Sequence, residues 1–168
     1  MSWTPKARRF WPLFLLVLLA DCGTKRAAET HLVPANVPHE FVGELVRLTL
    51  AYNPGAAMSI SLGVHSRLGF SLLALGALAI LGHMYRQTLP GDRLAAAGLA
   101  LIASGALGNL LDRLRSPRGV VDFIDVGVGN LRFWTFNVAD VAISCGAILL
   151  VLAFQRAGER ESAASLSP

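Results

Sequence analysis

Four long apolar segments constrain this chain more than any other feature of its sequence. They cover residues 10–29, 68–86, 94–114 and 136–155. Each offers about 20 residues, the length that an α-helix needs to cross the hydrocarbon core of a bilayer. Hydrophobic residues make up 54% of the chain and charged residues only 15%, which is unusual for a water-soluble domain. We therefore predict an all-α membrane protein with four transmembrane helices.

One membrane domain is expected to account for nearly the whole chain. A chain of 168 residues has room for about one domain, and we place this domain at residues 1–157. The remaining segment, 158–168, is rich in Ser, Ala and Glu. This composition predicts a disordered tail on the same side of the membrane as the N-terminus.

The basic residues predict how the four helices are oriented. Four crossings leave both termini on one side, and basic residues gather at the segment ends on that side. They are Lys6, Arg8, Arg9, Arg86, Arg93, Arg156 and Arg160. The two longer connections, 30–67 and 115–135, are more sparsely basic. The positive-inside rule therefore predicts cytoplasmic termini and places the longer connections outside.

Each of the longer connections carries a β-hairpin pattern. In residues 48–62, apolar side chains alternate with others on both sides of the turn signal Asn53-Pro54-Gly55. In residues 120–136, two arms flank Gly127-Val128-Gly129-Asn130, and Phe133-Trp134 suits the aromatic belt of a membrane interface. We predict two small hairpins at the outer membrane surface, the second of which returns the chain from position 122 to position 140.

Two aspartates stand where a membrane protein should avoid them. Asp122 lies in the second predicted hairpin, and Asp140 lies at the start of the last apolar segment. Carboxylates at membrane depth are costly and usually mark a functional site. Two carboxylates that share one proton can act as a general acid and a general base on a water and a carbonyl group. The simpler alternative is that Asn137 and Asp140, three residues apart, only cap the start of a helix.

Charged residues also interrupt the first apolar segment. Asp21 and Lys25 are four residues apart, so they can pair along one face of a helix. Such a pair inside a membrane is either a structural ion pair or part of a substrate contact. The residues alone leave both interpretations open.

The third segment carries amide, charged and small residues near its end. Asn109 and Arg113, again four apart, present hydrogen-bond donors on one helix face and are predicted to orient the acidic pair. Ser104 and Gly108 form a small-xxx-small step, which lets another helix approach closely. Asp112 is expected only to neutralise its neighbour Arg113.

Several kinds of site find no support in the sequence. The four histidines are scattered without metal-ligand spacing, so we expect no metal and no cofactor. Cys22 and Cys145 both lie in apolar segments, which does not indicate a disulfide framework or a zinc site. The net charge of +4 forms no basic stripe with interleaved aromatic residues, so no nucleic-acid partner is expected.

Two other classes of function compete with hydrolysis. A small transporter or channel would use the buried charges as a proton or ion path, but these groups gather toward one face of the membrane. A non-catalytic scaffold would leave the two carboxylates without a purpose.

Five sequence blocks, taken in order, resemble the signatures of the bacterial lipoprotein signal peptidases, the signal peptidase II family. The blocks are Asp21-x-x-Thr24-Lys25, Asn53-x-Gly55-Ala56-Ala57, Gly105-Ala106-Leu107-Gly108-Asn109-x-x-Asp112-Arg113, Val120-Val121-Asp122-Phe123-Ile124-Asp125 and Phe136-Asn137-Val138-Ala139-Asp140. Each block is weak alone, but five in one order on four apolar segments are very specific. The resemblance covers about residues 10–155.

This resemblance implies a membrane aspartyl endopeptidase in which Asp122 and Asp140 form the catalytic pair. It also implies a set of residues around that pair and the substrate: Asp21, Lys25, Asn53, Gly55, Gly108, Asn109, Arg113, Asn137 and Ala139. The chain departs from the family pattern at Cys22 and at Met58-Ser59. Neither departure touches the acidic pair, so they concern substrate preference.

The resemblance also implies a substrate and a location. The substrate is a prolipoprotein whose lipobox cysteine already carries diacylglycerol, and the bond cut lies just before that cysteine. The enzyme is expected to span the bacterial inner membrane as a monomer surrounded by lipid, with its active site near the periplasmic face.

Overall fold

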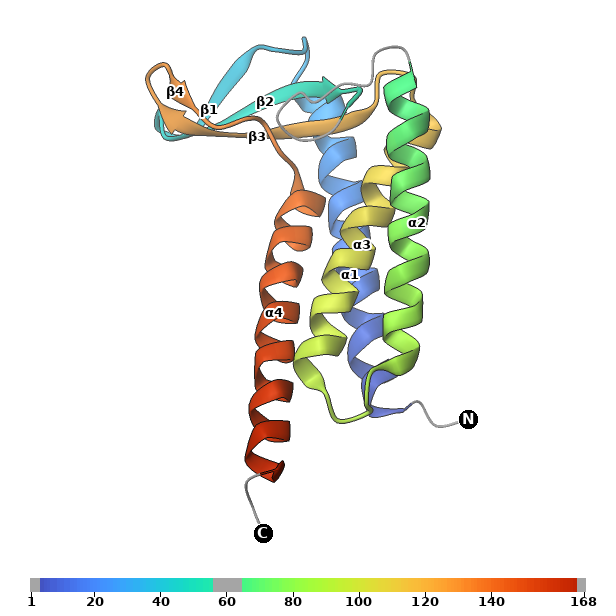
Figure 1. Ribbon diagram of the computed structural model, residues 1–168. Helices are drawn as coiled ribbons and strands as arrows, with labels where there is room; N and C mark the ends of the chain where they lie inside the picture. Colours follow the sequence, from blue (N-terminus) through green and yellow to red (C-terminus); the bar gives the residue numbers. More distant parts are fainter. Residues whose placement is uncertain (1–3, 56–64, 166–168) are drawn as a thin grey trace.

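The computed structural model describes residues 4–55 and 65–165. It shows four long helices that run side by side, with a small sheet across one end (Figure 1). The helices are α1 (Pro5–His31), α2 (Ser66–Gln87), α3 (Arg93–Arg115) and α4 (Val138–Ser165). The strands are β1 (Pro38–Val42), β2 (Val46–Asn53), β3 (Val120–Val128) and β4 (Leu131–Arg132). The fold is thus mostly helical with a small antiparallel sheet, as the sequence predicts.

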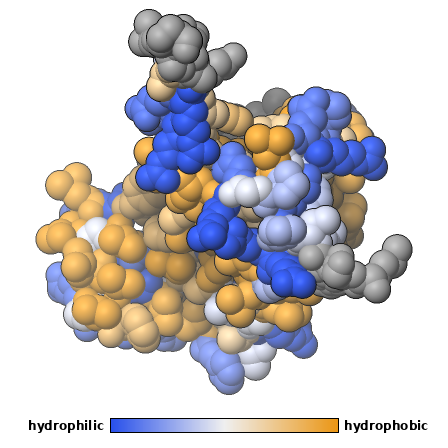
Figure 2. Space-filling view, turned by 90° about the horizontal axis from the view of Figure 1, so that it is seen from below, coloured by the Kyte–Doolittle hydropathy of each residue, from blue (hydrophilic) through white to orange (hydrophobic). Residues whose placement is uncertain are grey.

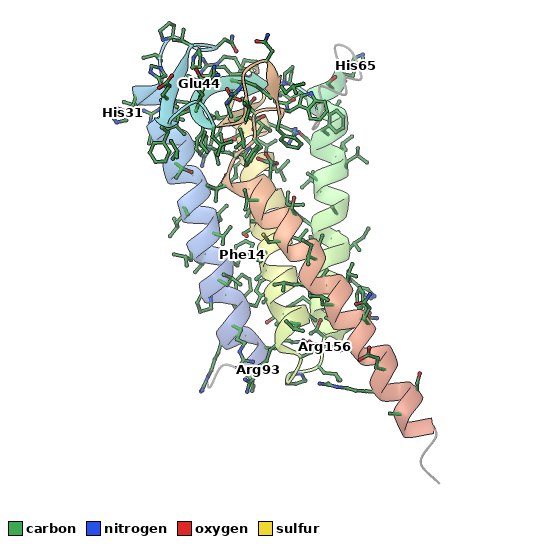
Figure 3. The ribbon with its side chains drawn as sticks, turned by 90° about the vertical axis from the view of Figure 1, so that its left-hand side faces the viewer. Phe14, His31, Glu44, His65, Arg93 and Arg156 are labelled. Atoms are coloured by element: carbon green, nitrogen blue, oxygen red, sulfur yellow. The ribbon has the colours of Figure 1, made fainter. Side chains whose placement is uncertain are left out.

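The sheet and the chain termini lie at opposite ends of the helices (Figure 1). We call these the sheet end and the terminal end. Figure 3 labels His31, Glu44 and His65 at the sheet end, and Arg93 and Arg156 at the terminal end.

Local capping signals fix where two of the helices begin. The side chain of Thr4 accepts a hydrogen bond from the backbone N–H of Ala7 at 3.3 Å, and Pro5 follows as the first residue of α1. Asp92 caps α3 in the same way, accepting from the N–H of Ala95 at 3.0 Å. Thr and Asp suit this position because their oxygens pair an N–H that the helix itself leaves free. Proline suits the first turn because it has no N–H to leave unpaired.

Three of the four predicted spans are long and apolar enough to cross a membrane by length and composition. They are Ser66–Gln87, Arg93–Arg115 and Val138–Arg160 within the described part of the chain. Helix α1 has the length but carries several charges, including Asp21 and Lys25. The prediction of four membrane-spanning helices is therefore confirmed only in part.

Glycines bring α3 and α4 into close contact. A Cβ atom added to Gly98 would lie 2.9 Å from the carbonyl oxygen of Gly146, and one added to Gly146 would lie 2.7 Å from that of Gly98. In lipid, helices associate through close packing, which small residues permit. Nearer the terminal end, Leu99 of α3 lies in an apolar cluster with Phe10 of α1 and Leu150 of α4. Helix α3 is thus the central helix, with 61% of its apolar window buried against 11% for α2.

The sheet has the strand order β1-β2-β3-β4, and all of its pairs are antiparallel. The second predicted hairpin is confirmed, because β3 and β4 pair around Gly129, which has a positive φ of 55°. The first prediction is only partly tested. Residues 48–53 do form a strand, but its partners are β1 and β3, and the expected second arm at 58–62 lies outside the described residues.

The C-terminal segment differs from the expectation of disorder. Helix α4 continues through Gly158 to Ser165. Adding a residue to an existing helix costs far less than starting a new one, and Ala, Glu and Arg are favourable helix residues. A polar composition alone therefore does not end this helix.

Candidate active site

Asp122 and Asp140 come from different elements that the β3–β4 hairpin brings together. Asp122 lies on β3 opposite Ala51 of β2, and only 3% of its surface is exposed. After β4 the chain runs back along β3, where Phe136 exchanges backbone hydrogen bonds of 2.8 and 3.0 Å with Ile124. Helix α4 begins directly afterwards, with Asp140 in its first turn. The return of the chain that the sequence predicts is therefore present.

Asn137 contacts both aspartates. Its side-chain amide donates to Asp122 Oδ1 at 2.7 Å, and its backbone N–H donates to Asp140 Oδ2 at 3.1 Å. The backbone N–H of Asp140 returns a bond of 3.0 Å to Asn137 Oδ1. This reciprocal pair is a capping box at the start of α4. The capping interpretation is thus correct, but it is not the whole account, because the cap also reaches Asp122.

Asn109 of α3 connects the acidic pair to buried charges behind it. Its amide nitrogen donates to Asp140 Oδ1 at 2.9 Å. Its amide oxygen accepts from Lys25 Nζ at 2.8 Å and from the amide of Asn137 at 3.2 Å. The side-chain amide of Asn109 therefore links Asp140, Asn137 and Lys25.

Lys25 lies between two carboxylates in the interior. Its ammonium group is 2.9 Å from Asp21 and 2.8 Å from Asp112, and its side chain is 4% exposed. The predicted pair of Asp21 and Lys25 is present. Asp112 was expected only to neutralise Arg113, but its ion pair in the structure is with Lys25, since adjacent residues on a helix do not face each other. Asp112 also accepts a hydrogen bond from the N–H of Val121 on β3 at 3.2 Å.

Two small residues allow Asp21 to reach the base of the site. Asp21 is fully buried and accepts a hydrogen bond from the N–H of Ala139 at 2.9 Å. A Cβ atom on Gly108 would collide with the Asp21 carboxylate, and one on Gly105 would collide with the carbonyl of Ala139. Gly105 and Gly108 therefore let α3 pack closely against α4 and α1 beneath the aspartates.

Asn53, Gly55 and Arg113 form the opposite side of the site. The Asn53 amide donates to Asp122 Oδ2 at 3.3 Å, while its oxygen accepts from the N–H of Gly55 at 3.0 Å. Arg113 donates to the carbonyl oxygens of Gly55 at 2.8 Å and of Asn109 at 3.1 Å. Arg113 thus attaches the turn after β2 to α3.

A cavity of about 830 Å³ opens in front of the aspartates. Six of the predicted site residues line it: Asp122, Asp140, Asn53, Gly55, Asn109 and Arg113. The other five, Asp21, Lys25, Gly108, Asn137 and Ala139, are not among its lining residues. The predicted residues therefore fall into two groups, one at the polar wall of the cavity and one in the layer behind it, and the sequence does not distinguish the two.

The apolar side of this cavity was not predicted. It is formed by the hairpin return, Phe133 to Phe136, and by the face of α4 that carries Val141, Ser144 and Cys145. These α4 positions follow Asp140 at helical spacing, so periodicity counted from Asp140 was the available signal. Phe133 and Trp134 were predicted only as membrane-interface residues.

The surroundings of Asp122 favour its protonated form. Burial raises the pKa of Asp122 to about 7, and the negative charge of Asp140 acts in the same direction. Hydrogen bonds from Asn137 and Asn53 and the charge of Lys25 oppose this increase. A carboxyl group with such a pKa can hold a proton near neutral pH and release it to a reacting group.

Comparison with known proteins identifies relatives over most of the chain. The family model described as Signal peptidase (SPase) II matches residues 13–156. A lipoprotein signal peptidase of Francisella tularensis subsp. novicida (strain U112) is 34% identical over 148 residues, which is 86% of this chain and 90% of that protein. A lipoprotein signal peptidase of Coxiella burnetii (strain Dugway 5J108-111) is 36% identical over 157 residues, which is 89% and 93% of the two chains.

A solved structure has the same fold. It is described as a bacterial membrane enzyme determined by the in meso method at 2.3 Å resolution. The TM-score is 0.77 at 26% sequence identity, and the match covers 86% of this chain and 85% of the other.

Proposed function

Since this chain belongs to the signal peptidase II family, as the match over residues 13–156 shows, we propose that it cuts prolipoproteins with Asp122 and Asp140 as its catalytic pair. The observation that carries the proposal is the double contact of Asn137, which links both carboxylates at the wall of one cavity. Such a linked pair suits acid–base hydrolysis by an activated water.

One aspartate acts as the general acid and the other as the general base. Asp122 holds the shared proton, since its burial raises its pKa to about 7. Asp140 is the base of the pair, and its carboxylate oxygens are held by hydrogen bonds from Asn109 and from the N–H of Asn137. Asp140 takes a proton from water, which attacks the scissile carbonyl carbon while Asp122 protonates the carbonyl oxygen. As the C–N bond breaks, Asp140 gives its proton to the leaving nitrogen and Asp122 recovers its own from a hydroxyl of the gem-diol, which restores the starting state without a covalent enzyme intermediate.

The cavity suits a substrate that is part peptide and part lipid. Asn53, Gly55 and Arg113 offer hydrogen-bonding groups on one side, and Phe133, Trp134 and the α4 face offer apolar contacts on the other. A prolipoprotein whose cysteine carries diacylglycerol matches both sides. The scissile bond just before that cysteine meets the aspartates, while the acyl chains lie along α4 toward the bilayer.

Helix α1 is the fourth membrane span in this proposal. Its 27 residues extend about 40 Å at 1.5 Å per residue, enough to cross the hydrocarbon core. Its charged residues Asp21 and Lys25 are buried within the protein, whereas Leu16 and Leu19 are 66% and 69% exposed. Charges that are paired inside a bundle, with leucines toward lipid, are compatible with a membrane span.

The proposed location is the bacterial inner membrane, with cytoplasmic termini and the aspartates near the periplasmic face. The excess of basic residues at the terminal end supports this orientation. The overhanging sheet offers a second argument: seen from the terminal end, its underside is mostly hydrophobic (Figure 2). Exposed residues of the sheet and the segment that follows it include Phe41, Leu131, Phe133 and Trp134. A sheet lying on the outer membrane surface explains their exposure.

The decisive experiment measures cleavage of a diacylglyceryl-modified prolipoprotein by detergent-solubilised protein in a gel-shift assay. We expect the wild type to cut, and Asp122→Asn and Asp140→Asn each to lose about 10³-fold or more of the rate, because each removes one proton-transfer group. Both variants keep the size of the side chain, so unchanged helical content serves as the folding control. Activity retained in either variant contradicts the two-aspartate mechanism.

A matched substrate tests the lipid part of the proposal. The same precursor without diacylglycerol should be cut much more slowly, because it lacks the groups that fill the apolar side of the cavity. Equal cleavage of the two precursors contradicts the lipid requirement while leaving the aspartate mechanism intact.

A further inference from the structure

A second cavity lies at the terminal end, far from the aspartates. Its volume is about 270 Å³, and it lies where α4 passes the start of α3. From α3 and the connection before it come Gly91, Asp92, Arg93 and Leu94, and from α4 come Ala153, Arg156, Ala157 and Arg160. Along α4, Asp140 and Arg156 are about 24 Å apart at the helical rise of 1.5 Å per residue. This cavity therefore takes no part in the proposed cleavage.

The walls of this cavity are strongly basic. Arg156 and Arg160 are four residues apart, so they share one face of α4, and Arg93 faces the same cavity from α3. Two like charges at this spacing cost a few tenths of a kcal/mol in a helix. Arginine guanidinium groups suit phosphate oxygens because their donors form a planar fork.

The three arginines have no acidic partner among the side chains that the structure describes. None of the ion pairs there includes Arg93, Arg156 or Arg160. Asp92 is the carboxylate in the cavity wall, and its Oδ1 already accepts the N–H of Ala95 as the cap of α3. With three arginines and one carboxylate among the described side chains of its wall, the cavity carries a net positive charge.

We propose that this cavity binds the phosphodiester group of an anionic phospholipid in the leaflet at the terminal end. The inference rests on the chain spanning the bilayer and goes beyond the proposed cleavage. The location supports a lipid rather than a free anion. Leu94 and Ala153 bring apolar surface to the cavity, and Leu152 and Phe154 on the same turns of α4 are 40% and 58% exposed. A headgroup in the cavity thus leaves its acyl chains beside apolar helix surface.

The test is a lipid titration of the full-length protein, read by native mass spectrometry in a neutral detergent. We expect the wild type to bind one phosphatidylglycerol at least about ten-fold more tightly than phosphatidylcholine, since three arginines face the headgroup and only phosphatidylglycerol carries a net negative charge. The combined variant Arg93→Gln, Arg156→Gln, Arg160→Gln should lose this preference. Equal binding of both lipids by the wild type overturns the proposal.

Arg86→Gln is the matched control. It removes one exposed arginine from the end of α2 at the same end of the protein, and Arg86 does not line the cavity. Its lipid preference should equal that of the wild type. If Arg86→Gln weakens the preference as much as the combined variant does, the attraction is a general surface effect and the proposed site is wrong.

Inorganic phosphate distinguishes a lipid site from a site for a free anion. Phosphate should compete only weakly with phosphatidylglycerol, because it brings no acyl chains. Full competition at low phosphate concentration means that the cavity is a site for a free anion, and the lipid assignment falls. Cleavage in detergent should be unchanged in the triple variant, so this result is independent of the proposed function. Thermal unfolding in phosphatidylcholine verifies that the variant is folded.

Discussion

The two ends of the helix bundle are held together by opposite kinds of contact. At the sheet end, α1, α3 and α4 meet through buried polar side chains: Asp21, Lys25, Asn109, Arg113 and Asn137. Toward the terminal end, the helices meet through an apolar cluster that includes Phe10, Leu81, Leu99 and Leu150. A polar group away from water needs a specific partner, whereas an apolar side chain in lipid needs only a matching shape. The sheet end therefore depends on particular hydrogen-bond and ion-pair partners, whereas the terminal end depends on how well apolar side chains fit together.

The largest expected effect on stability follows from removing the central charge of the sheet end. Lys25→Met leaves the carboxylates of Asp21 and Asp112 without their shared cation. Loss of one partner from a buried ion pair costs about 3–5 kcal/mol, and we expect the free energy of unfolding in detergent to fall by that amount.

Arg26→Met is the control for this change. It removes the neighbouring cation, which is 81% exposed and 3.9 Å from Glu29. An exposed pair contributes at most about 1 kcal/mol. Similar losses in the two variants contradict the view that buried pairing holds the sheet end together.

The next effect is on the pH dependence of stability. Asp122 has a pKa near 3.8 when unfolded and about 7 when folded, so the folded state holds its proton more tightly. The contribution of this group to stability is therefore complete below about pH 4 and is lost as the pH rises from about 4 through about 7. We expect Asp122→Asn to raise the melting temperature at pH 8 and to change it much less at pH 5.

Asp125→Asn provides the comparison on the same strand. Asp125 pairs with Arg132 at 2.6 Å, so its neutralisation should lower the melting temperature at pH 8 instead of raising it. A rise of equal size in both variants means that the effect comes from general charge and not from the burial of Asp122.

The stability of the terminal end should depend on how completely its apolar side chains fill the interior. Leu99→Ala removes a side chain that is 1% exposed and leaves a cavity in the apolar cluster. We expect a loss of about 2 kcal/mol, at the low end for buried leucines, because lipid tails are as apolar as leucine. The rate of prolipoprotein cleavage by folded protein should not change. Leu72→Ala is the control, at a residue that is 59% exposed on α2. It should change neither the free energy of unfolding nor the cleavage rate. A large loss of stability there contradicts a lipid-facing position for this side chain.

The smallest effect concerns the main polar contact between helices at the terminal end. Lys6 donates to the backbone oxygens of Tyr85 at 2.7 Å and Thr88 at 2.8 Å, at the end of α2. Lys6→Met should cost about 1 kcal/mol, because a cation there pairs free carbonyls and complements the helix dipole. The exposed neighbour Arg8, changed to Met, should have no measurable effect on the melting temperature.

The sequence predicts most reliably what depends on a single segment. The apolar segments predict α2, α3 and α4, and the turn at Gly129 predicts the β3–β4 hairpin. Family blocks nominate the site residues, of which six line the large cavity. The end of α4 was missed because composition does not show where a helix stops when the residues beyond are good helix formers.

The sequence by itself determined the apolar helices, the turn around Gly129 and the residue types that can share a proton. Only the tertiary structure decided which of these groups meet. Asp112 pairs with Lys25 of α1 and not with Arg113 beside it, and β2 pairs with β3, from which α2 and α3 separate it in the sequence. The physical reason is that periodicity fixes which side chains share a face of one element, whereas partners between elements depend on how closely the elements pack. In this protein, glycines at 98, 105, 108 and 146 set that distance.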